Sequence, residues 1–584
     1  MITKDSISDF FDLDAQARRK SWEALMKLSI KDRVRKRKAI QSVRIDPHYH
    51  EKSEEGHDLL RLTYKVNLSD FKEGDCLLLY KQGKNDNIKC TLYSFGEDNC
   101  IIVEVFPPNM PDNLPSFYDG SLVLEKDLVD LRTYVFYPFL CQLPENNSDF
   151  WNTVLFNTKA IPTFEGIEEC DKEIKGTEES LGLELLPRQR EAILKSLSAK
   201  DYYLIQGPPG TGKSFVLGLI ILEEMVYFKH KVIVAGPNHM AINNALEQAL
   251  KISPCYSGDI FKIGQSYNAP KHTVKVEGEE FQIKNILRLN SVAANKSEDA
   301  WVMGITPHSL YSSRGRGLEC DTLIIDEAGQ MSIPLALMGM IKAKKVILAG
   351  DHKQLSPIIS SEEIPTIMRQ SAFQSLMTDD NCTMLDVSFR MCEPICKFVS
   401  DLFYDGKLNS YKKGCDNKIV SNNPLYSFDN PVVIHHVDDD GEQTSDMEAD
   451  FIANTVAGFI REGVDPDEIG ILSPFRAQAA NIRRYIKNHT DITKENAVAV
   501  TSDTVDKMQG QEKDVIIFSL TSGNLEYMKE MEEFLYSPHK LNVAFSRAKS
   551  KLIIVGNIEQ IKKIDHINFP HISQMIESKC VKYI

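Results

Sequence analysis

The spacing of apolar side chains near the N-terminus is that of a helix. Residues 17–28 place apolar side chains at helical intervals, and we expect a helical stalk over residues 1–45. Further along, the period falls to two, because apolar and polar residues alternate through 60–66. Short apolar runs follow at 77–80, 91–93 and 101–105. This pattern predicts a small antiparallel barrel over residues 46–125, followed by a return helix over residues 126–165.

The second half of the chain alternates apolar strands with helices, which is typical of parallel α/β folding. The pattern begins near residue 180 and predicts two successive series of buried strands. The first series lies at 203–206, 232–235, 322–325 and 346–349, and the second at 432–435, 469–472, 515–520 and 552–555. Two such series imply two nucleotide-binding α/β domains in tandem, with the seam between them near 375–385.

Length and charge limit the class of protein. A chain of 584 residues is long enough for several domains, each with its own core. A content of 42% hydrophobic and 26% charged residues is typical of a globular protein, and no apolar run approaches the roughly 20 residues of a membrane-spanning helix. The net charge of −15 argues weakly against a nucleic-acid partner, although a local basic track decides that question.

Three polar segments each allow two interpretations. The basic cluster after the first helix either contacts phosphate groups or forms a solvated helix face. Arg314 and Arg316, in a short glycine-containing loop, either touch nucleic acid or form a plain surface loop. The histidine pair at 435–436 and the acidic residues 438–440 suggest a metal site, but a strand end followed by an acidic turn explains them more simply. The basic cluster consists of Lys31, Arg33, Arg35, Lys36, Arg37 and Lys38.

The cysteines bear on the cellular compartment. There are twelve, and they are scattered without a CxxC pair. This distribution favours buried free thiols in a reducing cytosol over a zinc or iron–sulfur site. We therefore expect a cytoplasmic protein without a membrane partner.

The segment GPPGTGKS has the pattern of a phosphate-binding loop, because it follows an apolar strand and opens a helix. Its glycines let backbone N–H groups approach phosphate oxygens, and the helix N-terminus adds a favourable dipole. Lys213, expected at an exposed position, would reach the β- and γ-phosphates, and the Ser214 hydroxyl would ligate Mg²⁺. The predicted site for ATP and Mg²⁺ comprises Gly207, Pro208, Pro209, Gly210, Thr211, Gly212, Lys213 and Ser214.

Two carboxylates follow the strand predicted at 322–325. A carboxylate at the carboxyl end of such a strand faces the ligand side of an open α/β sheet. Asp326 is the candidate Mg²⁺ ligand, directly or through water, and Glu327 the candidate that orients and deprotonates the attacking water. Together with the phosphate-binding loop, the pair indicates a nucleotide hydrolase.

Three further residues indicate a motor. Gln354, in GDHKQLSP after another strand, is placed to sense the γ-phosphate. Arg390 and Arg547, in the second α/β domain, can reach across to the nucleotide and stabilise charge on the transferred phosphoryl group. Because they come from the other domain, they would couple hydrolysis to domain motion.

The order of these segments resembles superfamily 1B helicases. That branch includes the up-frameshift, immunoglobulin-mu-binding and replication nuclease-helicase proteins, and DEA-x-Q followed by GD-x-x-QL is characteristic of it. The similarity extends over about residues 180–560. Its motifs here are QGPPGTGKS, DEAGQ, GDHKQLSP, SFRMCEP, TVDKMQGQEKDVI and LNVAFSRAK.

The resemblance implies roles for individual residues. Gln189 matches the glutamine that reads adenine, Phe389 the aromatic residue that stacks on the base, and Glu512 the residue that contacts ribose. Arg390 and Arg547 match the two γ-phosphate arginines. The positions that match contacts to nucleic acid are Pro237, Asn238, His239, Thr306, Ser473, Pro474, Phe475 and Thr504.

The resemblance also implies a fold of the α/β class. It consists of two tandem RecA-like P-loop domains with the helical stalk and an inserted small β-barrel. The first RecA-like domain would span 166–378 and the second 379–584. An insertion at 252–298 would be either the family's small helical insert or a plain connection.

The implied function is an ATP-dependent helicase or translocase that moves 5′-to-3′ on single-stranded DNA or RNA. The core is expected to be monomeric, and a protein partner stays open. An alternative is a nucleotide-dependent switch, or a remodelling ATPase in a larger complex, without unwinding activity. The catalytic set in the preferred interpretation is Lys213, Glu327, Gln354, Arg390 and Arg547.

Overall fold

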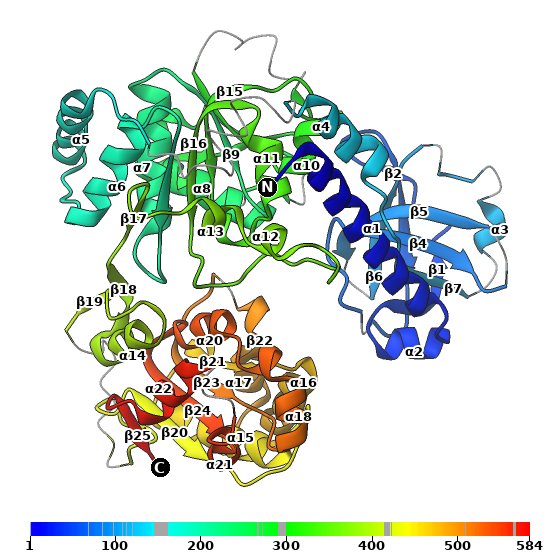
Figure 1. The fold of residues 1–584 in the computed structure, drawn as a ribbon. Coiled ribbons are helices and arrows are strands. Elements are labelled where there is room, and N and C mark those ends of the chain that lie inside the picture. The colour runs from blue at the N-terminus through cyan, green and yellow to red at the C-terminus, as the bar shows by residue number, and fades with distance from the viewer. Residues whose placement is uncertain are drawn as a thin grey trace.

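In the computed structural model the chain forms a β-barrel and two α/β units (Figure 1). The structure describes residues 2–67, 69–83, 86–96, 99–107, 109–111, 114–118, 121–144, 162–265, 268–270, 273–289, 300–413, 421, 423–508, 510–564 and 568–584. Within these ranges, no helix is long and apolar enough to cross a bilayer. The cysteines in the same ranges carry free thiols.

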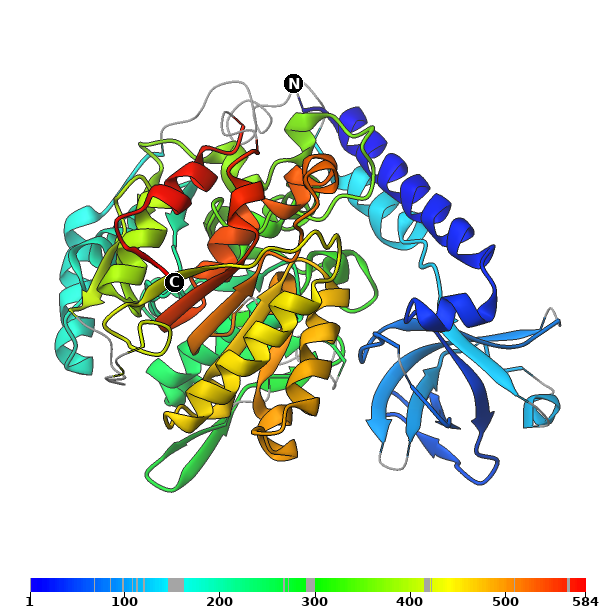
Figure 2. The same cartoon turned by 90° about the horizontal axis from the view of Figure 1, so that it is seen from below.

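The N-terminal helix α1 (Lys4–Met26) begins at a capping box, in which the Thr3 hydroxyl accepts from the backbone N–H of Ser6 at 3.2 Å. It packs against the return segment, where the Phe11 and Phe136 rings stack with centroids 3.9 Å apart. Figure 2 shows α1 running from the first α/β unit to the barrel. The return segment comprises η1 (Arg132–Phe136) and α4 (Tyr137–Gln142), and residues 145–161 of the predicted return helix lie outside the described residues.

The barrel is a closed ring of six strands, in the order β1-β7-β4-β5-β6-β3, because β1 also pairs with β3. Strand β2 extends the edge at β3. Apolar side chains that alternate along the strands fill the interior. The strands are β1 (Ala39–Ile45), β2 (Glu51–Lys52), β3 (Asp58–Thr63), β4 (Cys76–Lys81), β5 (Asn87–Gly96), β6 (Cys100–Val105) and β7 (Leu122–Lys126).

The barrel begins earlier than its sequence predicts. The helical pattern ends with the short helix α2 (Ile30–Arg35), and β1 already starts at residue 39, inside the segment expected to be helical. A bulge between Gln41 and Val43, with Ser42 at a φ of 61°, breaks the alternation of β1 and hides it from a search for period two.

Two residues of the basic cluster help to hold the barrel together. Arg33 is buried and pairs with Glu125 of β7 at 2.6 Å. Lys38 pairs with Asp70 at 2.8 Å, although 36% of its side chain is exposed. Arg33 therefore fits neither alternative from the sequence, whereas both alternatives stay open for the exposed residues Lys31, Arg35 and Lys36.

The first α/β unit is built on an eight-stranded parallel sheet in the order β13-β10-β14-β9-β15-β16-β8-β17. Apolar clusters cover both faces of the sheet. Its strands are β8 (Tyr202–Gln206), β9 (Lys231–Ala235), β10 (Ile260–Ile263), β13 (Lys284–Ile286), β14 (Trp301–Gly304), β15 (Cys320–Ile325), β16 (Ala343–Gly350) and β17 (Cys382–Met384). The helices include α5 (Ile167–Leu181), α6 (Pro187–Ser198), α7 (Lys213–Val226), α8 (His239–Ile252), α10 (Pro307–Tyr311), α11 (Ile333–Met340), α12 (Thr366–Arg369) and α13 (Ala372–Leu376).

The insertion at 252–298 differs from both forms that the sequence suggested. In its described residues, β10 and β13 join the main sheet, and β11 (Thr273–Val276) and β12 (Glu279–Gln282) form a hairpin. Glu277 and Gly278 both have positive φ, as a two-residue hairpin turn requires. Residues 290–299 of the insertion lie outside the described residues.

The second α/β unit has a six-stranded parallel sheet in the order β22-β21-β23-β24-β20-β25. A ribbon of β18 (Val387–Cys392) and β19 (Asn409–Lys412) runs toward the first unit (Figure 1). Strand β17 belongs to the first sheet although it follows residue 378, where the boundary was expected. The remaining strands are β20 (Val432–His436), β21 (Ile469–Ser473), β22 (Thr501–Thr504), β23 (Lys513–Ser519), β24 (Ala548–Gly556) and β25 (Val581–Tyr583). The helices include α14 (Glu393–Phe403), α15 (Asp446–Arg461), α16 (Arg476–Asn488), α17 (Lys494–Ala499), α18 (Leu525–Glu530), α19 (Glu532–Leu535), α20 (Pro538–Phe545), α21 (Ile558–Ile561) and α22 (Pro570–Glu577).

Candidate active site and nucleic-acid interface

The phosphate-binding loop lies between β8 and α7, at the carboxyl edge of the first sheet. Two of its glycines are required by the backbone, because Gly210 and Gly212 have φ of 74° and 79°. At Gly210, the neighbouring side chains also leave no space for a Cβ. A Cβ on Gly210 would lie 2.5 Å from the Cβ of Arg390 and 2.8 Å from the Ser388 hydroxyl, both from the second unit. The loop therefore carries glycine where the other unit approaches it.

Lys213 is buried, which corrects the expectation that it lies exposed. Its side chain is 13% exposed, and Nζ lies 2.5 Å from Asp326 Oδ1 and 2.7 Å from Glu327 Oε1. Burial opposes the charge on Lys213, but the two carboxylates outweigh it and raise its pKa. The lysine is thus held cationic between the two residues that the sequence assigned to Mg²⁺ and to water.

The two carboxylates are positioned by the end of β15. Glu327 adopts a left-handed φ of 56°, an uncommon conformation for a residue with a side chain. Its backbone N–H donates to Asp326 Oδ1 at 2.8 Å, and Gln330 Nε2 donates to Glu327 Oε2 at 2.9 Å. Burial tends to raise the pKa of Glu327, but the charge of Lys213 and these hydrogen bonds outweigh it and lower the pKa.

The donor set fits a Mg²⁺ ion. A hydroxyl and a carboxylate are the oxygen ligands that this hard cation prefers. Ser214 follows Lys213 directly, and Lys213 contacts Asp326, so the two predicted ligands meet at the same point of the sheet edge. In the described part of the chain, no group of three or more His, Cys, Asp or Glu residues is arranged to hold a metal ion.

Asp351 connects the two α/β units, although it was not among the site residues predicted from the sequence. The carboxylate accepts from Gln354 Nε2 at 2.7 Å, from Gln206 Nε2 at 3.2 Å and from the Tyr404 hydroxyl at 2.6 Å. Tyr404 in turn accepts from Asn542 Nδ2 at 2.8 Å. The signal was present in GDHKQLSP, where Asp351 stands three residues before the glutamine that was singled out.

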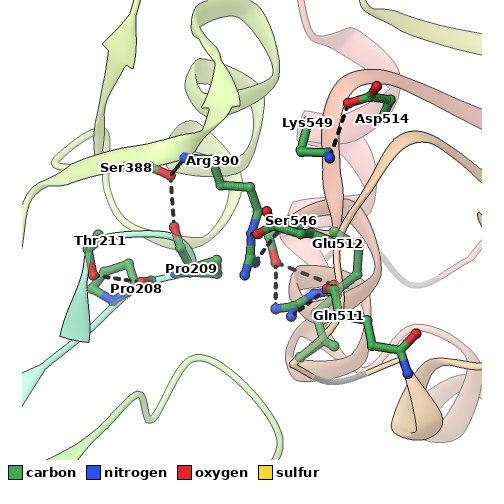
Figure 3. Close-up of polar contacts among 12 residues, drawn as sticks. Pro208, Pro209, Thr211, Ser388, Arg390, Gln511, Glu512, Asp514, Ser546 and Lys549 are labelled. Carbon is green, nitrogen blue, oxygen red and sulfur yellow. Dashed lines mark hydrogen bonds and ion pairs between the residues drawn. The ribbon is translucent and has the colours of Figure 1, made fainter. Parts of the chain in front are cut away.

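The two predicted arginines lie close together in the second unit, and Figure 3 shows Arg390 directed toward Ser546 and Glu512. Arg390 Nε lies 2.5 Å from Glu512 Oε2, and its Nη1 donates to the Ser546 carbonyl at 3.2 Å. Arg547 donates to the Val543 carbonyl at 2.9 Å and lies 3.5 Å from Gln354 Oε1. Burial lowers the pKa of Arg547, and the charge of Arg390 adds to this effect.

The two residues predicted to hold the adenine base, Gln189 and Phe389, lie next to the phosphate-binding loop. A Cβ on Gly212 would lie 3.0 Å from Gln189 Nε2 and 4.0 Å from the Phe389 ring, so both residues flank the loop. Gln189 Nε2 donates to the Thr211 carbonyl at 3.2 Å. Phe389 is 37% exposed, and its ring centroid lies 4.9 Å from that of Tyr411, an exposed aromatic residue that no motif had marked.

The residues predicted to contact nucleic acid follow neighbouring strands of each sheet. Residues 237–239 and Thr306 come after β9 and β14, which pair in the first sheet. Residues 473–475 and Thr504 end β21 and β22, which pair in the second sheet. Since the carboxyl ends of parallel strands share one edge, both groups lie on the ligand side of their sheets.

Not all of these side chains are available to a ligand. The Ser473 hydroxyl is fully buried and lies 3.0 Å from the Thr521 hydroxyl. Phe475 is buried and packs against Phe534 with centroids 5.3 Å apart. Asn238 caps α8, accepting from the N–H of Ala241 at 2.9 Å. A strand contact at 473–475 would therefore come from the backbone and Pro474.

The segment around His435 takes the simpler of its two interpretations. The His435 ring stacks on Phe451 with centroids 3.7 Å apart. His436 Nδ1 accepts from the backbone N–H of Ile558 at 3.1 Å. Both histidines are accounted for by packing and hydrogen bonds at the end of β20.

Comparisons with known proteins agree with this geometry. Two family models, each described as an AAA domain, match residues 184–300 with 298–362 and residues 368–559. DNA polymerase alpha-associated DNA helicase A of Schizosaccharomyces pombe is 28% identical over 73% of this chain and 70% of its own length. The mouse DNA replication ATP-dependent helicase/nuclease DNA2 is 28% identical over 65% of this chain, and the ATP-dependent helicase NAM7 of Saccharomyces cerevisiae is 28% identical over 61%. The chain spans only 38% and 40% of the length of these two relatives. The two domain matches together span most of residues 184–559, and with the ordered motifs and these relatives they show an ATP-dependent helicase enzyme that is similar to the superfamily 1B helicases.

Proposed function

We propose that this protein hydrolyses ATP between its two α/β units and uses the cycle to move 5′-to-3′ along single-stranded DNA or RNA, unwinding duplex ahead of it. The two units are the tandem RecA-like domains of this proposal, and α1 with α4 is the stalk that carries the barrel. The observation that carries the proposal is the approach of Arg390 and Arg547, from the second unit, to the phosphate-binding loop and Gln354 of the first.

In the proposed chemistry, Glu327 accepts a proton from the attacking water and Lys213 contacts the β- and γ-phosphates. Arg390 and Arg547 stabilise the charge that develops on the transferred phosphoryl group. Ser214 and Asp326 would hold Mg²⁺, which when bound would neutralise charge on the phosphates. Phe389 and Gln189 hold the base.

Movement follows from which contacts depend on the γ-phosphate. Gln354 lies between Asp351 of its own unit and Arg547 of the other. A change at the γ-phosphate would therefore alter contacts in both units. The predicted strand contacts follow β9 and β14, and β9 pairs directly with β15, which ends at Asp326. Closing and opening of the two units would therefore shift the two groups of strand contacts relative to each other.

The location and partners form a smaller part of the proposal. We place the protein in the cytoplasm, because Cys320 and Cys396 are buried free thiols that suit a reducing compartment. Single-stranded nucleic acid is the proposed partner, and the core acts as a monomer.

Strand displacement tests the polarity. Duplexes with a single-stranded tail at only the 5′ end or only the 3′ end are incubated with ATP and Mg²⁺, with Glu327→Gln as the control. Release of the short strand from the 5′-tailed duplex alone is the expected result. Release from the 3′-tailed duplex alone would overturn the polarity, and hydrolysis without release from either would favour a remodelling ATPase.

A further inference from the structure

A buried lysine stands at the carboxyl end of β10, one strand beyond the predicted contacts to nucleic acid. Lys262 is fully buried, and its Nζ donates to the Ile263 carbonyl at 2.9 Å and lies 3.0 Å from His239 Nδ1. Among the residues that the structure describes, no carboxylate pairs with it. A buried ammonium without a counter-ion is costly, so an anion bound nearby would favour the charged form of this lysine.

Two arginines extend the positive charge next to this lysine. The backbone N–H of Leu289 donates to the Arg314 carbonyl at 3.0 Å, which brings Arg288 beside Arg314. Arg314 Nη1 is buried without a hydrogen-bond partner. Burial and then the charge of Arg314 lower the pKa of Lys262 to about 7, and burial with the charges of Lys262 and Arg314 lowers that of His239 to about 3. The groups therefore lie close enough to repel one another.

The barrel supplies a carboxylate to this positive group. Glu55 lies in the turn between β2 and β3, and its side chain is only 7% exposed. One carboxylate oxygen lies 3.2 Å from Arg314 Nη2 and the other 3.6 Å from Arg288 Nη2. Glu55 therefore pairs with the two arginines, whereas no carboxylate in the described part of the chain pairs with Lys262. We call Glu55 with Arg288 and Arg314 the barrel contact.

The position of the barrel contact relates it to the nucleic acid. In the first sheet, β10 pairs with β14, and β14 pairs with β9. The predicted strand contacts follow β9 and β14, so Lys262 continues the same row by one strand. His239 belongs both to the predicted contacts and to the environment of Lys262.

A second barrel carboxylate has a similar position against the other unit. Asp70 lies 3.1 Å from Arg476, which directly follows the predicted strand contact at 473–475. The barrel thus places one acidic side chain against each α/β unit, and each arginine involved is close in sequence or in space to a predicted strand contact. Acidic side chains so placed resemble the phosphates of a strand in charge and in acceptor geometry.

We propose that Arg288 and Arg314 form a binding site for a backbone phosphate of the single strand, with the buried Lys262 behind them, and that Glu55 of the barrel competes with the strand for that site. The site deepens the proposed function and depends on it. A phosphodiester carries one negative charge and can accept hydrogen bonds from a guanidinium group, as a carboxylate can. When the strand takes the site, the barrel contact opens and the barrel is free to move from the first unit.

Binding of a labelled oligonucleotide measures the competition. Fluorescence anisotropy with oligo(dT) and oligo(U), each of about 20 nucleotides, is recorded over a range of salt for Glu55→Gln and for Glu54→Gln. Glu54 is the matched control, because it is the exposed neighbour with the same charge. We expect Glu55→Gln to bind about three- to tenfold more tightly than Glu54→Gln, because a competing anion is gone.

Arginine variants locate the effect. Arg314→Gln and Arg288→Gln should each weaken binding and reduce the salt slope by about 1, since one phosphate contact is lost. Arg288 is half exposed, so its variant tests the site even if Arg314→Gln fails to fold. In an Arg288→Gln/Arg314→Gln background, Glu55→Gln should no longer tighten binding, because both arginine partners of Glu55 are gone.

The outcomes separate this inference from the proposed function. Equal affinity of Glu55→Gln and Glu54→Gln, with tight binding by the unmodified protein, would overturn the site and leave the helicase proposal standing. Tightening that persists in the Arg288→Gln/Arg314→Gln background would also overturn it. Failure of the unmodified protein to bind either oligonucleotide would overturn both. A difference between the oligo(dT) and oligo(U) arms names the preferred strand.

Discussion

The nucleotide site and the barrel contact each hold cations against the protein's own carboxylates, but they do so at different depth. In the nucleotide site, Lys213 is largely buried between Asp326 and Glu327, which a single sheet edge fixes in place. At the barrel contact, Arg288 is 56% exposed and its partner Glu55 comes from a separate β-barrel. Removing one partner of a buried pair costs about 3–5 kcal/mol, whereas exposed pairs contribute about 0–1 kcal/mol.

The difference separates ion pairs that serve catalysis from an ion pair whose carboxylate can be exchanged for another anion. Charges that must act on a phosphoryl group need fixed positions, and the parallel sheet provides them at strand ends. Charges that must release one anion and accept another need a partner that can leave, and a turn at the rim of a barrel can do so. The same residue chemistry thus serves two purposes according to what holds the carboxylate.

The largest expected effect tests the carboxylate of Glu327. Glu327→Gln keeps the hydrogen bonds with Lys213 and Gln330 sterically possible but removes the proton acceptor. We expect ATP turnover to fall about 10³- to 10⁴-fold while nucleotide binding persists. Steady-state hydrolysis with a nucleotide-binding titration measures this, with Glu319→Gln, an exposed residue before β15, as the control. Retained turnover would remove Glu327 from the catalytic set.

The next effect tests whether the second unit takes part in catalysis. Arg547→Ala should lower turnover about 10³-fold and spare nucleotide binding, because an arginine finger acts on the transition state. Single-turnover rates and nucleotide affinity distinguish the two quantities. Arg461→Ala, at an arginine 70% exposed on the same unit, is the control. An equal loss of rate and affinity would show that Arg547 only binds.

The smallest effect concerns a buried carboxyl that has no cation. Glu448 accepts from the Ser519 hydroxyl at 2.6 Å and from the Thr521 N–H at 3.1 Å, and burial raises its pKa to about 8. The unfolded chain releases this proton near pH 4.5, so between about pH 5 and 8 unfolding releases a proton and stability falls as pH rises. Glu448→Gln should abolish a decline of the order of 3 kcal/mol.

Chemical denaturation at pH 5, 6.5 and 8 measures this decline. Glu442→Gln, at an exposed glutamate of the same unit, controls for the loss of a charge. Parallel pH profiles for Glu448→Gln and the unmodified protein would show that Glu448 is ionised throughout. That result would also remove the contrast with Asp326, which is buried beside the cation of Lys213.

The sequence predicted the parallel strands well, because they have short-range signals, and the nucleotide-site prediction rests on signals of the same kind. Each of the eight apolar runs, from 203–206 to 552–555, is a strand of one of the two sheets. Glycines of the phosphate-binding loop and carboxylates at strand ends are likewise read from local pattern. The burial of Lys213 was not predictable, since it follows from side chains more than a hundred residues away.

Features that depend on distant partners escaped the sequence. Strand β1 was hidden by its bulge, and β10 with β13 was taken for an insertion because their pairing partners are remote. Asp351 joins Gln206 and Tyr404, which no local pattern connects. Arg314 had two equal interpretations until the structure placed Glu55 against it.

ATP hydrolysis by the purified protein, alone and with single-stranded DNA or single-stranded RNA, tests the central claim most directly. Lys213→Ala serves as the control for hydrolysis at this site. Strong stimulation by at least one polymer, absent in the variant, is the result we predict for a motor that moves on a strand. Hydrolysis that neither polymer changes would contradict the motor and favour a nucleotide-dependent switch.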